Sequence, residues 1–600
     1  MTTIIPNPQT KTWIQPNNSD VFGTIYMSQN IDIQENYSRM RIGKRLIVNS
    51  QDTDTGLSKL YNPVAFTVYN NNLWTLGGTT ASDGKVYYNS NTELVNNFNA
   101  DALANTPTDI DSRYSDMING SNGKMYCTSP TKLYEFDSST GWNATTRTLT
   151  TAGTHQLAVY ASRIYVVNAG NTIVSADIAT GSFGTLSTVG NSYALRLGLD
   201  TDSTTITFVR ASASRLWIGT VNTRGGKGYI YEWDGQSTLV TRSYRLESSG
   251  ALSCVIKDEI PYVIDANGDL IAFNGGTFQK LAGFNRKKDK ARLYNATRAD
   301  NTRFIHHNGM SVINGRINIL INNLNGDYAG TVEEQIPSGV WEYTPENGLI
   351  HKHGFTLAKS SDTITDYCQV RVARVGALTE ILSRSQDVDS DTNGTFLAGA
   401  ALYTDASSTK AVISYEDTND TLQKAGIYVS PMIEATGVYD LWQKIVVKYR
   451  RLLNSTDKIV VKTRTVEVDP TEATITYTST TTFTTTTDIS AYAVGDEVEF
   501  IQGVGAGRTA HITAISGSGT YTVTVDETIT GATTQTAKVR FGKWNKVGTI
   551  SGQTLQFSEY SLPQADQSNV MVQVKLWFLF TGKNEMYSLG IISQNYKSNV

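Results

Sequence analysis

The chain has 600 residues and a formal net charge of −4, and only 18% of its residues are charged. This length exceeds one ordinary hydrophobic core, so about two to four domains are expected. The charge gives no global basic field of the kind that attracts nucleic acid. Thr, Ser, Asn, Gly and Tyr are abundant and amphipathic helical runs are nearly absent, which favours an all-β chain.

The cysteines and the apolar runs bear on the cellular compartment. Cys127, Cys254 and Cys368 are far apart and odd in number, so they predict neither a disulfide framework nor a zinc site. Residues 1–13 lack a basic start followed by an apolar core, so no secretory signal is expected. The longest apolar run, residues 576–580, is far too short for a membrane span. We therefore expect a protein that folds in a reducing cytosol and has no membrane span.

Residues 1–20 are polar and rich in Pro and Asn, which predicts an extended N-terminal arm. Arms of this kind dock on a neighbouring subunit or remain disordered. Both alternatives stay open from the sequence.

A repeating strand pattern begins at residues 68–78, where apolar residues alternate with small or polar ones. Asn70, Asn71 and Asn72 interrupt the alternation and supply a turn, because Asn tolerates left-handed backbone angles. Similar units recur near residues 117–137, 157–177, 206–235, 253–276 and 310–343. The aromatic residues that anchor these units lie roughly 40 to 50 residues apart, the period of propeller blades: Trp74, Tyr126, Tyr165, Trp217 and Tyr262.

Residues 21–425 are therefore predicted to form a β-propeller of about six to eight blades, with seven favoured. One blade has two apolar faces and cannot bury either alone, whereas blades stacked around an axis bury both. The segment at residues 44–48 is predicted to supply the strand that closes the ring against the last blade. The alternative is a long sandwich of unrelated hairpins.

A candidate calcium loop lies in the last part of the predicted propeller. Asp389, Asp391 and Asn393 place oxygen ligands on alternate residues, and Gly394 follows for the sharp turn. The closing Glu of such a loop is missing, since Ala400 stands in its place. Residues 265–269 form a similar but less complete pattern. Calcium is the one cofactor that the sequence suggests, and ordinary blade turns are the alternative.

The pattern of predicted strands in the sequence changes near residue 426. Two similar strands, at residues 441–450 and 457–464, and long alternating strands at the chain end predict a β-sandwich of jelly-roll type. This sandwich is assigned to residues 426–470 and 541–600. Residues 471–540 carry a Thr-rich run and short strands between Gly turns, which predict a small β-barrel inserted into a sandwich loop.

The sequence shows no recognisable catalytic cluster. His351 and His353 point to one side of a predicted strand, but no third metal ligand is recognisable. No nucleophile elbow is found, and no pair of carboxylates stands out for glycoside cleavage. The 31 tyrosines suit either packing between sheets or stacking on sugar rings. We therefore expect no enzymatic activity and assign no catalytic residue.

These features together resemble structural proteins of tailed-bacteriophage virions, in particular the propeller-bearing nozzle or hub proteins of short-tailed phages. The resemblance is carried by the blade opening at residues 71–78, the Lys-Ile-Val-Val-Lys strands at 444–448 and 458–462, and the barrel segments at 494–498 and 505–512. The resemblance covers most of the chain. It implies a symmetric ring of copies, assembled in the host cytoplasm and incorporated into the virion, with no catalytic residue to transfer.

The partners implied are further copies of the chain, other tail or connector proteins, and DNA passing through a channel. One alternative function is a receptor-binding adhesin that recognises host-surface glycans, motivated by the surplus of aromatic residues. A second is a propeller hydrolase or lyase acting on polysaccharide.

Overall fold

A computed structural model describes most of residues 99–180, 204–284, 305–321, 339–354 and 425–595, with gaps, and only shorter segments within 2–89, 184–196 and 372–416. These residues form strands and turns. No helix among them is long and apolar enough to cross a membrane. The all-β prediction is confirmed.

Six four-stranded sheets and one five-stranded sheet form the blades of a propeller, which are numbered here in chain order. Blade 1 contains β6 (Tyr61–Tyr69), β7 (Asn72–Gly78), β8 (Lys85–Asn89) and β9 (Asn99–Ala100). Blade 2 contains β10 (Met117–Asn119), β11 (Met125–Thr128), β12 (Lys132–Asp137), β13 (Gly141–Trp142) and β14 (Arg147–Thr148). Blade 3 contains β15 (Leu157–Tyr160), β16 (Arg163–Asn168), β17 (Thr172–Asp177) and β18 (Ala194–Arg196).

The remaining blades follow the same antiparallel order. Blade 4 contains β19 (Thr204–Ala211), β20 (Leu216–Asn222), β21 (Tyr229–Trp233) and β22 (Arg242–Arg245). Blade 5 contains β23 (Ala251–Lys257), β24 (Ile260–Asp265), β25 (Asp269–Phe273) and β26 (Phe278–Gly283). Blade 6 contains β27 (Met310–Ile313), β28 (Arg316–Ile321), β29 (Gly339–Thr344) and β30 (Gly348–His353). Blade 7 contains β31 (Val372–Glu380), β32 (Phe396–Tyr403), β33 (Thr409–Glu416) and β5 (Leu46–Val48).

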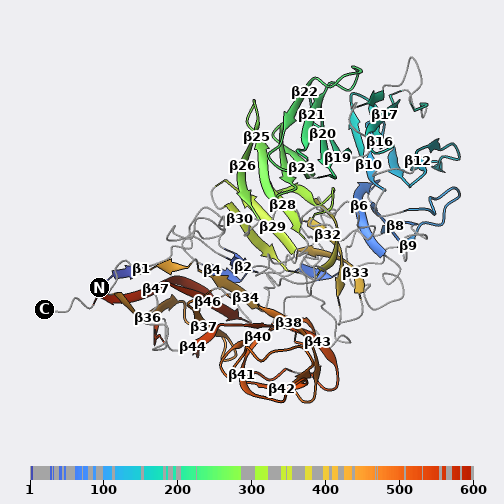
Figure 1. The fold of residues 1–600 in the computed structure, drawn as a ribbon. Coiled ribbons are helices and arrows are strands. Elements are labelled where there is room, and N and C mark those ends of the chain that lie inside the picture. Colours follow the sequence, from blue (N-terminus) through green and yellow to red (C-terminus); the bar gives the residue numbers. More distant parts are fainter. Residues whose placement is uncertain are drawn as a thin grey trace.

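The blades close into a ring, as Figure 1 shows at the upper right. Their innermost strands β6, β10, β15, β19, β23, β27 and β31 contact one another in this order, and β31 also contacts β6. Strand β5 completes blade 7 by pairing antiparallel with β33, with Ile47 opposite Tyr415. The predicted closing strand is therefore confirmed, and so is the favoured count of seven blades.

The anchor aromatics pack between blades. Trp74 of blade 1 lies 4.9 Å from Phe136 of blade 2, and Trp217 of blade 4 lies 5.1 Å from Phe273 of blade 5, measured between ring centroids. Aromatic side chains bury a large area and stabilise such contacts further through edge and face geometry. These tryptophans therefore join neighbouring blades.

Two six-stranded sheets form the sandwich. One contains β1 (Thr2–Ile4), β3 (Ile31–Asp32), β4 (Met40–Ile42), β36 (Asp440–Tyr449), β45 (Phe557–Ser561) and β47 (Glu585–Asn595). The other contains β2 (Met27–Gln29), β34 (Ala425–Val429), β35 (Ile433–Glu434), β37 (Lys458–Arg464), β44 (Asn545–Ser551) and β46 (Met571–Leu579). Its core merges with that of blades 5 and 6, since one apolar cluster contains Leu270, Trp341, Tyr428 and Trp442.

A closed six-stranded barrel lies beside the sandwich, at the bottom of Figure 1. It contains β38 (Thr471–Tyr477), β39 (Thr482–Thr485), β40 (Glu497–Gly503), β41 (Thr509–Ser516), β42 (Tyr521–Val525) and β43 (Thr536–Gly542). The barrel has an apolar cluster of its own, including Phe483, Phe500 and Phe541. The predicted insertion of a small barrel between sandwich strands is confirmed.

The N-terminal strands depart from the predicted domain ranges. Residues 21–425 were assigned to the propeller, but β2, β3 and β4 within this range pair with sandwich strands. Strand β1, within the predicted arm, pairs with β47 of the same chain, with Thr3 opposite Ile592. These strands have only two or three residues each, too few to show a period-2 pattern in the sequence.

Candidate functional site

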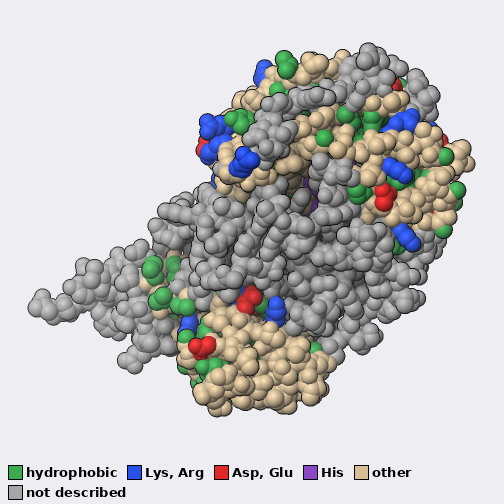
Figure 2. All heavy atoms as spheres, turned by 45° about the vertical axis from the view of Figure 1, so that its right-hand side comes forward, with side chains coloured by type: hydrophobic (Ala, Val, Ile, Leu, Met, Phe, Trp, Pro, Cys, Tyr) green, Lys and Arg blue, Asp and Glu red, His purple; other side chains and the backbone are tan. Residues whose placement is uncertain are grey.

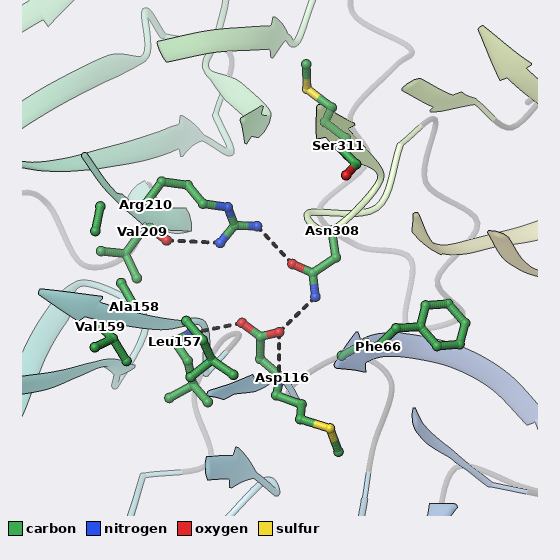
Figure 3. Close-up of a pocket in the computed structure, with 14 residues that line it drawn as sticks. Phe66, Asp116, Leu157, Ala158, Val159, Val209, Arg210, Asn308 and Ser311 are labelled. Carbon is green, nitrogen blue, oxygen red and sulfur yellow. Dashed lines mark hydrogen bonds between the residues drawn. The ribbon is translucent and has the colours of Figure 1, made fainter. Parts of the chain in front are cut away.

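A polar network joins blades 2 to 6 along their innermost strands, and we call it the axial hub. It contains Asp116, Gln156, Arg210 and Asn308, which come from segments at or beside the innermost strands. Figure 3 shows Asp116, Asn308 and Arg210 pointing toward one another. Because inner strands converge on the axis, polar residues beside them meet there although they are far apart in sequence.

Arg210 is the centre of the hub. Its guanidinium donates five hydrogen bonds, to the carbonyl oxygens of Val209, Cys254 and His307 and to the side-chain oxygens of Gln156 and Asn308, over 2.8 to 3.2 Å. An arginine side chain carries five N–H donors, so this set uses all of them. The positively charged guanidinium is thus surrounded by oxygen atoms from blades 3, 4, 5 and 6.

Asp116 completes the hub on the side of blade 2. Its Oδ1 accepts hydrogen bonds from Asn308 Nδ2 at 2.8 Å and from its neighbour Met117 N at 2.9 Å. Its Oδ2 accepts one from Leu157 N of blade 3 at 3.0 Å. Burial raises the pKa of Asp116 above its usual value, while Arg210 and these hydrogen bonds act in the opposite direction.

A cavity of about 390 Å³ opens beside the hub. Its lining comes from the innermost strands or adjoining residues of blades 1, 2, 3, 4 and 6. Asp116, Arg210, Asn308 and Ser311 are polar residues of this lining, and Phe66, Ile118 and Val159 are apolar residues of it. Volumes of about 300–1,000 Å³ are typical of sites for small molecules. We refer to this space as the axial cavity.

A buried glutamate recurs on the third strand of three blades. Glu135, Glu232 and Glu342 pair with a basic residue at the start of the neighbouring strand, namely Lys124 at 2.9 Å, Arg215 at 2.6 Å and Arg316 at 3.0 Å. Their second carboxylate oxygens accept bonds from Tyr126, Tyr244 and Lys352. Because both oxygens of each carboxylate have partners within the blade, these pairs stabilise the blades and are not catalytic candidates.

A second polar assembly holds the barrel against the sandwich. Lys462 of β37 donates to Glu497 of β40 at 2.5 Å and to Thr509 of β41 at 2.8 Å. Lys575 of β46 donates to the other oxygen of Glu497 at 2.9 Å. All three charged side chains are at most 4% exposed. One buried carboxylate is thus shared by two lysines of the sandwich.

This arrangement shifts the pKa values in a definite direction. Burial alone would raise the pKa of Glu497, but Lys462 and Lys575 outweigh it and lower the value to about 2. Burial lowers the pKa of Lys462 to about 8. The positive charge of Lys575 also lowers this pKa, whereas the negative charge of Glu497 raises it. Glu497 is therefore ionised at neutral pH and holds both ammonium groups in place.

Three further ion pairs link the sandwich to the barrel, again with the positive charge on the sandwich side and the negative charge on the barrel side. Lys458 pairs with Glu527, Lys543 with Asp496 at 2.6 Å, and Lys546 with Asp526 at 2.8 Å. In every pair the lysine belongs to the sandwich or its connection and the carboxylate to the barrel. We call the complete set the ionic joint: Lys458, Lys462, Lys543, Lys546, Lys575, Asp496, Glu497, Asp526 and Glu527.

The residues predicted to bind calcium, Asp389, Asp391 and Asn393, lie outside the described residues, so calcium binding there stays a prediction. The less complete pattern at residues 265–269 forms a turn in which Asp265 Oδ1 accepts hydrogen bonds from Asn267 N and Asp269 N. Burial raises the pKa of Asp265 to about 6. Backbone donors therefore occupy this carboxylate as in an ordinary Asx turn.

His351 and His353 both lie buried on β30, as the period-2 pattern predicts for one side of a strand. The ring of His351 packs edge-on against Trp341, with 5.2 Å between the centroids. Among the described residues, no group of three or more His, Cys, Asp or Glu side chains is placed to hold a metal ion.

Sequence reasoning missed both the axial hub and the ionic joint. The hub had a weak signal, because a polar residue stands one or two positions before Met117, Leu157 and Met310, where strands begin. The ionic joint had another weak signal, since Lys458 and Lys462 flank three apolar residues of a predicted strand. Neither signal identifies the partner, which comes from a distant part of the chain.

Comparisons with known proteins add little to this geometry. No family model matches the sequence, and no curated protein is significantly similar to it. A chain in the crystal structure of a mitotic checkpoint complex is 12% identical, with a TM-score of 0.35, over 63% of this chain and 95% of that one. The computationally designed Ika8 protein is 13% identical, with a TM-score of 0.32, over 62% of this chain and 100% of its own. Scores this low carry no argument, so the fold assignment rests on the strand pairing described above.

Proposed function

We propose that this chain is a structural component of a bacteriophage particle, of the tail nozzle or hub type, which forms a symmetric ring of copies. The family resemblance of the sequence suggests this role. The supporting observation is that all three parts of the molecule are joined by buried contacts and not merely by linkers.

The two joints differ in chemistry but both resist movement. The propeller and the sandwich share one apolar cluster, in which Trp341 of blade 6 and Trp442 of the sandwich are fully buried. The barrel is held by the ionic joint, whose centre at Glu497 is excluded from solvent. Breaking a buried ion pair by moving one partner away costs about 3–5 kcal/mol. A body joined in this way suits a load-bearing subunit.

The proposed ring also determines where DNA would pass. Within one chain, the axial hub links Asp116, Asn308 and Arg210 across the propeller axis. The axial cavity, about 390 Å³, is a small-molecule volume and not a passage for a duplex. DNA leaving the particle would therefore contact a channel formed between copies in the ring, together with other tail or connector proteins.

Quantitative mass spectrometry of gradient-purified phage particles tests this proposal. We expect the full chain to copurify with capsid and tail proteins at a fixed number of copies per particle. Its absence from particles that contain the other tail proteins would rule the proposal out.

A receptor-binding adhesin is the second candidate, and the surface of the barrel favours it. Most charged residues of the barrel are used in the ionic joint or in the cluster of Arg540 with Glu472 and Glu499. The outer faces of strands β38 and β42 instead carry exposed threonines, namely Thr474, Thr476 and Thr522. Figure 2 shows few charged side chains over this lower part of the molecule. Binding of the purified chain to intact host cells, competed by host-surface glycans, would support this function.

A further inference from the structure

The axial cavity retains polar groups that the hub does not use. Asp116 Oδ2 accepts a single hydrogen bond, from Leu157 N at 3.0 Å, so this oxygen has room for a second donor. Ser311 of β27 also lines the cavity and is only partly buried. Its hydroxyl has no hydrogen-bond partner among the described residues. One strong acceptor and one hydroxyl are thus available to a bound molecule.

The charge balance of the hub limits the kind of molecule that fits. The guanidinium of Arg210 uses its five donors within the hub, so it offers none to an anion. The positive charge of the same guanidinium also acts on the carboxylate of Asp116, which reduces the attraction of that carboxylate for a cation. An uncharged ligand is therefore favoured over either kind of ion.

The apolar part of the cavity lining complements the polar groups of Asp116 and Ser311. Phe66 and the partly buried Ile118 and Val159 supply C–H and ring surface around the opening. A molecule with hydroxyl groups on its edges and C–H groups on its faces would satisfy both parts of the lining together. A hydroxyl bound to a carboxylate forms a charge-assisted hydrogen bond, which is stronger than a bond between neutral groups.

We propose that the axial cavity binds one or two units of an uncharged sugar. One hydroxyl of the sugar donates to Asp116 Oδ2, and another exchanges a hydrogen bond with Ser311. The hub holds Asp116 in place for this contact through Asn308 and the main chain of Leu157. The inference does not depend on the role proposed for the chain in a tail.

The test measures binding of glucose, galactose and N-acetylglucosamine to the full chain by saturation-transfer NMR and calorimetry. Glucosamine and glucuronate serve as charged counterparts of similar size. Ser311→Trp fills the cavity without removing a hub residue, and Ser518→Trp places the same side chain on an exposed turn of the barrel. Thermal unfolding of each variant confirms that it is folded.

We expect at least one uncharged sugar to bind more tightly than both charged counterparts. Ser311→Trp should weaken this binding by about tenfold or more, equivalent to about 1.4 kcal/mol, and Ser518→Trp should leave it unchanged. The inference is overturned if no uncharged sugar binds, if a charged counterpart binds as tightly, or if folded Ser311→Trp protein binds like the unmodified chain.

Discussion

Asn308 Nδ2 donates a hydrogen bond of 2.8 Å to Asp116 Oδ1 across 192 positions of sequence. The bond links blade 6 to blade 2 from opposite parts of the ring, and Asn308 also receives a bond from Arg210 of blade 4 at 2.8 Å. Contacts of this span require blades 2, 4 and 6 to be in place around the axis. The axial hub therefore reports on the closed propeller as a whole and not on any one blade.

Replacing Asn308 tests the contribution of the hub to stability. In Asn308→Ala, Asp116 loses a donor and Arg210 loses an acceptor, and both are buried or partly buried groups. We expect the free energy of unfolding to fall by about 1–3 kcal/mol. Urea denaturation measures it. Asn119→Ala is the matched control, because Asn119 makes an exposed bond to Val68 O between blades 2 and 1. An equal loss in both variants would contradict the role of the hub.

Glu497 provides the corresponding test of the ionic joint. Glu497→Gln leaves Lys462 and Lys575 buried without a full counter-charge, which should cost about 3–5 kcal/mol. Hydrogen exchange of barrel and sandwich amides and chemical denaturation measure the effect. The control Glu527→Gln removes a partly exposed pair with Lys458 and should cost about 1 kcal/mol or less.

Replacing the whole buried centre separates charge from packing. In the variant with Lys462→Met, Glu497→Leu and Lys575→Met, no charge is left unpaired, so stability should return to the original value or exceed it by about 1–4 kcal/mol. If this variant were as unstable as Glu497→Gln, lost packing and not an unpaired charge would explain the single substitution.

The same carboxylate predicts a dependence on acid pH. Lys462 and Lys575 overcome the effect of burial and lower the pKa of Glu497 from 4.5 to about 2. Since the folded-state pKa lies below the unfolded value, the contribution of Glu497 is complete above about pH 4.5 and is lost as the pH falls toward 2. The stability advantage of the unmodified chain over Glu497→Gln should shrink by on the order of 3 kcal/mol across this window. Denaturation of both proteins from pH 7 to about pH 2 tests it, and a constant difference would contradict it.

The predicted calcium loop is open to a direct titration. Calorimetry of the full chain with calcium should show binding heat, and Asp389→Ala with Asp391→Ala should abolish it, because oxygen ligands of the loop are removed. Asp488→Ala, at an exposed position of the barrel, serves as the control. Absence of heat in the unmodified chain would remove calcium from the account.

The architecture could be predicted from the sequence because its signals are local and repeated. The anchors Trp74, Tyr126 and Trp217 recur with the blade period, and each lies on the second strand of its blade. The strand at Leu46–Val48 was predictable because a propeller ring needs a closing strand and this run is apolar. The Thr-rich run from residue 478 and the following Gly turns identified the barrel in the same way.

The candidate sites could not be predicted to the same extent. Arg210 looks like any charged residue in a strand, and its five acceptors come from residues up to 98 positions away. Glu497 is one of many carboxylates, and its partners Lys462 and Lys575 lie 35 and 78 positions away on two different sandwich strands. Such groups are recognisable only when the topology brings them together. The recurring glutamates left a more visible pattern in the sequence. Each of them, Glu135, Glu232 and Glu342, stands between two aromatic residues.

The central claim is that this chain is a rigid building block of a symmetric ring. Electron cryo-microscopy of the assembled full-length chain tests it most directly. The account predicts closed rings of one copy number, with seven-bladed propellers and with the barrel at one fixed angle to the sandwich in every copy. Isolated single chains at high concentration, or copies whose barrels take many angles, would contradict it.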